Sequence, residues 1–314
     1  MKVIKIALLG TQHDYANGIV PLIISQLGFK IEWSTPKDCD LLIYGAFYKN
    51  SKKQYRLLPK PLRPFFKIIE KEINAGRSRP LTLFHTCESL RHNSITADYS
   101  ISFDLGANQT EHLRLPYWME LVDWSHEGII GNINPRFGEL LSLDKLTKPL
   151  GDQFLRRPQI ASFITSHLLE PRASLLTMLK NHMEVKCFGP YFDPTIKNHH
   201  ASSFIKKEVI SQFAFNLCPE NAMYPGYYTE KIPEAFLAGA LPISWTDSNV
   251  SHDFNPRAFI NLAPMTGDNF LALPDLLRSK TKLHQFSEQS LLLEKPTLSD
   301  AKKFILEIIL QATS

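Results

Sequence analysis

The sequence predicts an α/β protein with two domains, each built around a parallel β-sheet. The chain has 314 residues, which is long for one compact domain and natural for two. Short apolar runs alternate with stretches of helical periodicity in both halves, the pattern expected where helices connect parallel strands. Hydrophobic residues make up 44% of the chain and charged residues 21%, a composition typical of a soluble globular enzyme.

The first half alternates strand and helix patterns up to about residue 115. A helix follows Gly18 and ends at Gly28, because glycine adopts the left-handed conformation that ends many helices. A second helix over Pro64–Ala75 stops in the same way at Gly76. Strands are expected at Val3–Leu9, Phe29–Trp33, Asp40–Phe47, Pro80–His85, Tyr99–Phe103 and Leu113–Leu115.

The second half repeats the alternation after a turn-rich stretch. Periodicity fades between about Gly128 and Pro158, so this stretch is expected to connect the domains, which gives boundaries of 1–154 and 155–314. Helices are expected at Pro171–Asn181, at Ser202–Gln212 with Ser202 or Ser203 as cap, from near Thr229 to Gly239, and at Ala301–Leu310, where the last helix can dock on either domain. Strands are expected at Gln159–Ser166, Val185–Phe188, near Phe215, near Leu241 and at Ala258–Leu262.

Charge and cysteine content narrow the classes of partner and compartment. A net charge of +4 suits a phosphorylated ligand or an anionic membrane surface, but no basic run is interleaved with aromatics, so no nucleic acid is expected. No apolar run approaches the about 18 to 20 residues of a membrane-spanning helix, and Lys5 interrupts the apolar N-terminal run that resembles a signal peptide. Four scattered cysteines favour a reducing compartment. We therefore expect a cytoplasmic protein, with peripheral contact at the inner membrane as an option.

The stretch FNLCPENAMYPGYYTEKIPEAFLAGALPISW, Phe215–Trp245, gathers polar groups just where a helix begins. Thr229 is the expected N-cap, and the amides that follow it favour a phosphate. Lys231 adds a positive charge for the same anion, and the Glu230 carboxylate can accept hydrogen bonds from both hydroxyls of a ribose. The alternative is that Glu230 only complements the helix dipole and that Lys231 is solvated.

An ordered set of motifs around this stretch resembles the donor-site signature of glycosyltransferase family 10, the α1,3/α1,4-fucosyltransferases. The set comprises Phe213–Asn221, the run Y-Y-T-E-K at 227–231, Gly239–Ile243 and Asp253–Leu262. It is most similar to the soluble bacterial members of the Helicobacter type. The similarity extends weakly back to about Leu81 and leaves the first 80 residues unmatched.

The resemblance implies a GT-B architecture, in which two facing Rossmann-like domains have parallel sheets and the C-terminal domain holds GDP-fucose. Glu230 and Lys231 correspond to the family's pair for ribose and diphosphate, and Arg172 to an arginine at a helix start that contacts the diphosphate; the alternative for Arg172 is an ordinary solvated arginine. Cys218-Pro219 precedes Glu220 where the family often has an apolar or aromatic residue, which leaves the role of Glu220 open. The expected donor-binding residues are Arg172, Glu220, Asn221, Tyr227, Thr229, Glu230 and Lys231.

The segment LTLFHTCESL places one carboxylate, Glu88, just beyond a predicted strand. Chemistry on parallel sheets is found at the carboxyl ends of strands. The family has its catalytic base at a matching place, so the resemblance implies that Glu88 is the base, although Cys87 stands where the family has glycine. The alternative is a surface glutamate that caps the next turn.

The resemblance implies an inverting transfer of L-fucose from GDP-fucose to a hydroxyl of an N-acetylglucosamine- or glucose-containing glycan, with an oligosaccharide or lipopolysaccharide-type acceptor. An α1,3 linkage is expected, with α1,4 as the second option. No cofactor or metal is expected; Asp38-Cys39-Asp40 matches a metal-binding D-x-D run, but it leads into a strand rather than following one, as a turn would. A transferase for another GDP-sugar and a catalytically silent nucleotide- or glycan-binding protein are the alternatives. The oligomeric state is left open.

Overall fold

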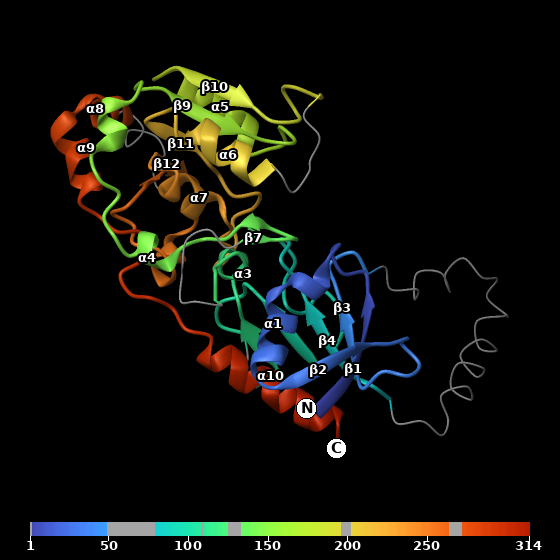
Figure 1. Ribbon diagram of the computed structural model, residues 1–314. Coiled ribbons are helices and arrows are strands. Elements are labelled where there is room, and N and C mark those ends of the chain that lie inside the picture. Colours follow the sequence, from blue (N-terminus) through green and yellow to red (C-terminus); the bar gives the residue numbers. More distant parts are fainter. Residues whose placement is uncertain (1, 49–78, 108–109, 125–132, 196–201, 264–271) are drawn as a thin grey trace, which may run out of the picture. The chain divides into compact units, whose positions relative to one another are not determined.

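The computed structural model describes residues 2–48, 79–107, 110–124, 133–195, 202–263 and 272–314, with the side chains at 202–205 left aside. The chain forms two compact units (Figure 1). The first unit comprises Met1–Ser102, Gly106–Arg114 and Leu298–Ser314, and the second comprises Phe103–Leu105 and Leu115–Thr297. The predicted helix at Pro64–Ala75 lies outside the described residues.

The first unit is built on a six-stranded parallel sheet in the order β2-β1-β3-β4-β5-β6. Apolar side chains such as Ile4, Ile43 and Phe84 are fully buried in it, which explains why its strands read as apolar runs. The strands are β1 Lys2–Leu9, β2 Phe29–Trp33, β3 Leu41–Tyr44, β4 Leu81–His85, β5 Tyr99–Ser102 and β6 His112–Arg114.

The last helix of the chain, α10 (Ser299–Ala312), completes the first unit. It contacts the first helix, α1 (Ile19–Gln26), and strand β4 (Figure 1). Its buried side chains recur every three to four residues, which turns one apolar stripe toward the unit: they are Ala301, Phe304, Ile305, Ile308 and Ile309. Residues more than two hundred positions apart in the sequence therefore share this core.

The second unit holds a five-stranded parallel sheet in the order β10-β9-β11-β12-β13. Its strands are β9 Ala161–Ile164, β10 Val185–Phe188, β11 Phe215–Leu217, β12 Leu241–Ser244 and β13 Ile260–Asn261. The helices that follow these strands are α5 Arg172–Lys180, α6 Ser202–Ile210, α7 Lys231–Leu237, α8 Ala272–Arg278 and α9 Lys280–Ser287. Together the two parallel sheets confirm the predicted fold class of two Rossmann-like units.

The stretch predicted to connect the domains, about Gly128 to Pro158, is not a separate connection; the segment 115–154, which includes most of it, is part of the second unit. It contains α3 (Tyr117–Glu120), a short antiparallel pair of β7 (Ile133–Asn134) and β8 (Gly138–Glu139), and α4 (Leu143–Leu146). Its apolar side chains are buried in one cluster with side chains that belong to or flank α7, which places the segment in the second unit; the cluster includes Trp118, Leu141, Leu146, Tyr228 and Phe236. The second unit therefore begins at Leu115 rather than at the expected residue 155.

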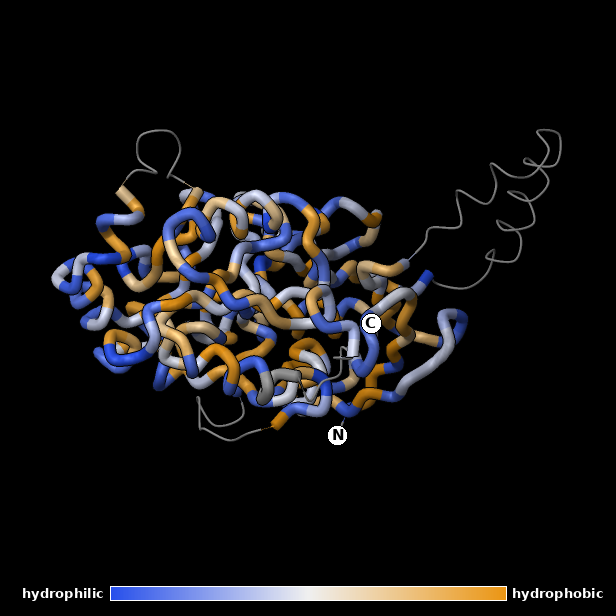
Figure 2. Tube along the Cα trace, turned by 90° about the horizontal axis from the view of Figure 1, so that it is seen from above, coloured by the Kyte–Doolittle hydropathy of each residue, from blue (hydrophilic) through white to orange (hydrophobic). Residues whose placement is uncertain are grey.

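The hydropathy of the chain alternates over short distances. The tube in Figure 2 changes between hydrophobic and hydrophilic colours every few residues. Among the described residues, no helix is long and apolar enough to cross a membrane.

Candidate functional site

A cavity of about 290 Å³ opens at the carboxyl ends of β9, β10 and β11 in the second unit. Strand β9 has β10 on one side and β11 on the other, so the chain reverses its direction of travel across the sheet at β9. Ligands of open α/β sheets bind at such a reversal. The charged residues that line the cavity are Arg172, Lys206, Glu230, Lys231 and Glu234.

Arg172 is the first residue of α5 and follows Pro171, as the sequence predicts. It is only 7% exposed, so it is not a solvated arginine. Its Nη1 donates to Thr165 Oγ1 at 2.8 Å and to His167 Nε2 at 3.0 Å, and its Nη2 donates to Asn221 Oδ1. Burial lowers the pKa of Arg172 and outweighs the attraction of Glu220 and Glu230. The guanidinium is thus held by three neutral acceptors.

His167 supports Arg172, and the sequence analysis did not identify it. Because an arginine is always a donor, His167 Nε2 must accept, and a neutral ring then carries its proton on Nδ1. Burial lowers the pKa of His167, and the charges of Arg172 and Lys231 lower it further. Nδ1 is buried and finds no hydrogen-bond partner among the described residues. The histidine therefore stays neutral beside the guanidinium.

Glu220 is buried behind the cavity wall and does not line the cavity. Its side chain is 1% exposed. Its carboxylate accepts from the Thr229 amide at 2.8 Å, from Thr229 Oγ1 at 2.8 Å and from Lys231 Nζ at 3.0 Å. These contacts tie the end of β11 to the start of α7. The role that the sequence leaves open is therefore the role of an internal counter-ion.

Thr229 does not cap α7, so that prediction is wrong. The helix begins at Lys231, and the N-cap position belongs to Glu230, whose side chain makes no capping hydrogen bond. The buried Glu220 carboxylate takes both the amide and the hydroxyl of Thr229, which removes that residue from the helix and its amide from any phosphate. Thr229 instead accepts from Lys231 Nζ at 2.7 Å.

Lys231 opens α7 and reaches the cavity with a side chain that is 16% exposed. Its ammonium group donates to Glu220 Oε2 and Thr229 Oγ1. Burial lowers the pKa of Lys231, but the carboxylates of Glu220 and Glu230 outweigh burial and hold the pKa above its ordinary value. Lys231 is therefore a fixed cation on the wall rather than a solvated lysine.

Glu230 stands next to Lys231 on the cavity wall, and a lysine from α6 approaches it. Lys206 Nζ lies 3.8 Å from Glu230 Oε1 and 2.5 Å from Glu234 Oε2. Burial raises the pKa of Glu230, but the ammonium groups of Lys231 and Lys206 outweigh burial and lower the pKa to about 2. Glu230 is thus ionised at neutral pH, and its carboxylate can accept hydrogen bonds from hydroxyl groups.

Lys206 was not among the site residues expected from the sequence. A signal for it exists in the spacing of α6, where Lys206, Val209 and Ile210 share one helix face and all line the cavity. A lysine on the apolar face of a helix is a marker of a buried ion pair. The prediction of the helix at Ser202–Gln212 concerned only its cap residue and therefore did not include Lys206.

Asn221 and Tyr227, the remaining expected donor residues, do not line the cavity. Asn221 is exposed and accepts from Arg172, so it supports the guanidinium. Tyr227 is 3% exposed and packs edge-on against Phe103, with ring centroids 4.9 Å apart. Its neighbour Tyr228 is also buried and donates to Asp247 Oδ1 at 2.6 Å. The structure therefore brings Arg172, Glu230 and Lys231 to the cavity and places the others around them.

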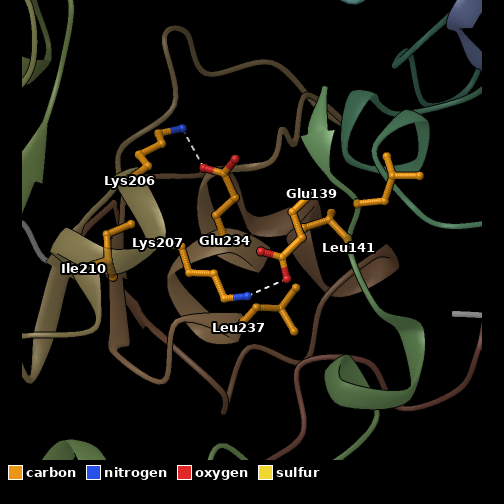
Figure 3. Close-up of a pocket in the computed structure, with 8 residues that line it drawn as sticks. Glu139, Leu141, Lys206, Lys207, Ile210, Glu234 and Leu237 are labelled. Carbon is orange, nitrogen blue, oxygen red and sulfur yellow. Dashed lines mark hydrogen bonds and ion pairs between the residues drawn. The ribbon is translucent and has the colours of Figure 1, made fainter. Parts of the chain in front are cut away.

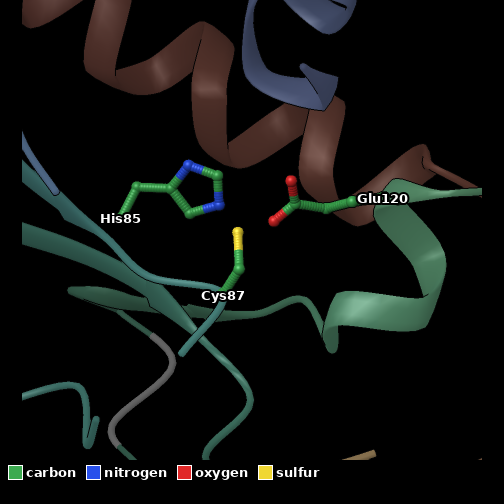
Figure 4. A group of neighbouring side chains, drawn as sticks. All are labelled: His85, Cys87 and Glu120. Atoms are coloured by element: carbon green, nitrogen blue, oxygen red, sulfur yellow. The ribbon is translucent and has the colours of Figure 1, made fainter. Parts of the chain in front are cut away.

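Glu88 lies in the first unit, at the carboxyl edge of its sheet. Strand β4 ends at His85, and Cys87 and Glu88 follow it (Figure 4 shows the side chains of His85 and Cys87). The Glu88 carboxylate is half-buried and accepts from Gln12 Nε2 at 3.1 Å, a residue that follows β1. The carboxylate thus contacts a neighbouring loop, while the backbone carbonyl of Glu88 accepts from the Leu90 amide in the turn that follows. Glu88 is thus positioned where parallel sheets carry chemistry.

The D-x-D run and Trp118 both have structural roles away from the cavity. The D-x-D run forms a turn, in which Asp38 Oδ2 accepts from Thr35 Oγ1 at 2.8 Å and Asp40 Oδ2 accepts from the Lys5 amide at 2.8 Å. Trp118 is buried in the core of the second unit, where its Nε1 donates to Asp253 at 2.9 Å.

Comparison with known proteins identifies relatives of this chain. Residues 155–285 match the family model of glycosyltransferase family 10 (fucosyltransferase), C-terminal part. The α-(1,3)-fucosyltransferase FucT of Helicobacter pylori is 26% identical over 264 residues, which are 79% of this chain and 50% of that protein. The 3-galactosyl-N-acetylglucosaminide 4-α-L-fucosyltransferase FUT3 of Bos taurus is 31% identical over 104 residues, 32% of this chain and 27% of that protein. The chain thus spans about half or less of the length of these relatives.

Solved structures show the same fold. The crystal structure of an α1,3-fucosyltransferase with GDP-fucose superposes with a TM-score of 0.68 and 23% identity, over 99% of this chain and 91% of that one. The structure of an α1,3-fucosyltransferase without a named ligand gives a TM-score of 0.65. The likeness confirms the GT-B fold class. Over the residues that form most of the second unit, the chain matches glycosyltransferase family 10, as its sequence motifs predict.

Proposed function

We propose that this chain transfers L-fucose from GDP-fucose to a hydroxyl of a glycan acceptor, with inversion at the fucosyl carbon. The observation that carries the proposal is the meeting of Arg172, Lys231 and Glu230 on one cavity wall at the sheet's reversal point. Two fixed cations next to an ionised carboxylate match a diphosphate attached to a ribose. The family match over residues 155–285 supports the same assignment.

In this proposal the donor nucleotide is bound by complementary charge and hydrogen bonding. The Arg172 guanidinium and the Lys231 ammonium bind the diphosphate oxygens, and the Glu230 carboxylate accepts from the ribose hydroxyls. The direct partners of Arg172 are neutral, so its charge remains available to an anion. Binding of the leaving group by preorganised cations stabilises the charge that develops as the sugar departs.

Inversion requires one in-line displacement at the fucosyl carbon and a base for the acceptor hydroxyl. We assign the base to Glu88. Its carboxylate takes the proton of the attacking hydroxyl, the new glycosidic bond forms, and the bond from the fucosyl carbon to the GDP oxygen breaks. No covalent enzyme intermediate is needed.

The acceptor is proposed to be an N-acetylglucosamine- or glucose-containing glycan, of the oligosaccharide or lipopolysaccharide type. The Helicobacter relative is named for α-(1,3) transfer and the Bos taurus relative for 4-α-L transfer. The Helicobacter relative matches far more of this chain, so we propose α1,3 transfer ahead of α1,4.

We further propose that the reaction is independent of metal ions, because Arg172 and Lys231 take the place of a divalent cation at the diphosphate. Assay in excess EDTA should then retain most of the rate. Complete loss that manganese restores would point instead to a metal at carboxylates such as Asp38 and Asp40.

Calorimetric titration with GDP, GDP-fucose, GDP-mannose and UDP-galactose tests the donor assignment. We expect the guanine nucleotides to bind and UDP-galactose to bind far more weakly. Turnover of GDP-fucose with a glycan array, followed by linkage analysis of the product, then identifies the acceptor. Binding of UDP-galactose as tight as that of GDP-fucose would refute the donor assignment.

A further inference from the structure

Lys206 joins two carboxylates at the start of α7, the N-cap residue Glu230 and Glu234 in the first turn. Its Nζ lies 2.5 Å from Glu234 Oε2 and 3.8 Å from Glu230 Oε1. Figure 3 shows Lys206 on α6 pointing toward Glu234 on α7, with their ion pair drawn as a dashed line. All three residues also line the larger cavity at the sheet edge. The pair therefore connects two helices directly beside the candidate ribose-binding carboxylate.

The two carboxylates need a cation between them. Glu230 and Glu234 are four residues apart, so they share one face at the start of α7 and repel each other. Their side chains are only 18% and 21% exposed, which limits screening by water. A lysine held between them removes the repulsion and fixes where the Glu230 carboxylate stands.

Lys206 lies much closer to Glu234 than to Glu230. The 2.5 Å contact to Glu234 is a short charged hydrogen bond, whereas 3.8 Å to Glu230 is an ion pair without one. Glu230 thus gains charge stabilisation from Lys206 without giving up an oxygen lone pair to its ammonium group. Glu234 meanwhile engages the ammonium group, which disfavours Lys206 as a phosphate contact.

We propose that Lys206, anchored by Glu234, is a positioning residue that aligns the Glu230 carboxylate to accept both ribose hydroxyls of the donor nucleotide. This inference rests on the proposed function and deepens it. It assigns to Lys206 a part in recognising the sugar of the nucleotide and no part in binding its phosphates.

The test compares three ligands by calorimetry: GDP, 2′,3′-dideoxy-GDP and inorganic pyrophosphate. A hydrogen bond to a charged acceptor contributes about 10- to 100-fold to affinity. The wild-type protein should therefore bind GDP at least about 10-fold more tightly than the dideoxy analogue, which lacks both ribose hydroxyls. In Lys206→Met this preference should fall to about two- to threefold, while pyrophosphate affinity stays within about twofold of wild type. Lys206→Arg keeps the charge and should retain most of the preference.

Lys207→Met is the matched control. Lys207 is the next residue of α6, and its Nζ lies 2.5 Å from Glu139 Oε1 beside a smaller cavity of about 40 Å³ (Figure 3). Lys207 does not line the larger cavity. We expect its substitution to leave the preference for GDP over the dideoxy analogue unchanged.

The possible results of these titrations distinguish failure of the inference from failure of the proposed function. An unchanged preference in a folded Lys206→Met protein would overturn the inference alone, and so would a pyrophosphate affinity that falls together with GDP affinity, because Lys206 would then be a phosphate ligand. Wild-type protein that binds GDP no better than pyrophosphate would overturn the proposed function and the inference with it. If Lys206→Met does not fold, the double variant Lys206→Met/Glu234→Gln removes the repulsion along α7, and the same loss of preference is expected of it.

Discussion

At the scale of single residues, the two cations of the cavity are held in different ways. Arg172 is bound by a hydroxyl, an imidazole and an amide, none of which carries charge. Lys231 is bound by the carboxylate of Glu220, which already offsets its charge. An incoming diphosphate therefore meets a cation with neutral direct partners at Arg172 and a cation already in direct contact with a carboxylate at Lys231.

This difference predicts an order of effects on nucleotide binding. Arg172→Met should weaken GDP binding by about 2 kcal/mol, near the lower end for truncating one partner of a desolvated ion pair, and Lys231→Met by less. Calorimetric titration measures both. Arg156→Met is the control, because Arg156 is 77% exposed and its ion pair within the described part of the chain is with Asp152. Equal GDP affinity in all three variants would mean that neither cavity cation contacts the nucleotide.

Glu220 gives a second prediction at this scale. Glu220→Gln breaks a buried ion pair, which typically destabilises a protein by about 3–5 kcal/mol, and it frees the charge of Lys231 for the ligand. We expect a lower melting temperature than wild type and a larger upward shift of that temperature on adding GDP. Thermal unfolding with and without GDP measures both quantities. A variant with wild-type stability that no longer binds GDP would show that Glu220 is a ligand contact after all.

At the scale of elements, the second unit is assembled from helices and strands whose local signals differ in strength. Pro171 and the strand β9 before it predict where α5 begins, and the structure confirms that Arg172 stands at this helix start. The apolar run of β4 predicts where that strand ends, and the structure confirms that Glu88 follows this strand end. The start of α7 was misplaced, because the buried carboxylate that captures Thr229 comes from nine residues earlier. The stretch from about Gly128 to Pro158 is predicted as a connection because the elements in and around it are too short to show a period; α4 has four residues. Its buried leucines meet side chains about ninety residues away, and no local pattern reveals such contacts.

Helix α10 allows a prediction for a single element. Ile308 is 1% exposed on its inner face, whereas Leu310, two residues later, is 51% exposed. Ile308→Ala should reduce the free energy of unfolding by about 2–5 kcal/mol, and Leu310→Ala by less than about 0.5 kcal/mol. Urea unfolding of both variants measures the contrast. Similar losses in the two would mean that α10 does not pack through this stripe.

At the scale of the whole molecule, the residue proposed for proton transfer and the residues proposed for donor binding belong to different units. Glu88 belongs to the first unit, and Arg172, Glu230 and Lys231 to the second. Donor binding and proton transfer should therefore respond to different substitutions.

Glu88→Gln separates the two functions. It keeps the size of the side chain and removes its basicity, so kcat should fall by about 10²–10⁴-fold while GDP affinity and thermal stability stay near wild type. Steady-state kinetics and calorimetry on the same preparation measure this, with Glu32→Gln on β2 as an exposed control. Near-normal turnover would assign the base elsewhere; Asp14 is the next candidate, since Glu220 is buried and committed to Thr229 and Lys231.

The membership of α10 in the first unit also has a consequence for the order in which the protein is synthesised. The ribosome makes the six strands of the first sheet early, but it reaches Leu298 only 184 residues after Arg114, the end of the sixth strand (298 − 114). At about 5–20 residues per second, this interval lasts roughly 10–40 s. During that time the apolar face that α10 will cover is exposed on the nascent chain. The second unit, which is nearly continuous in sequence, can therefore emerge whole before the first unit receives its last helix.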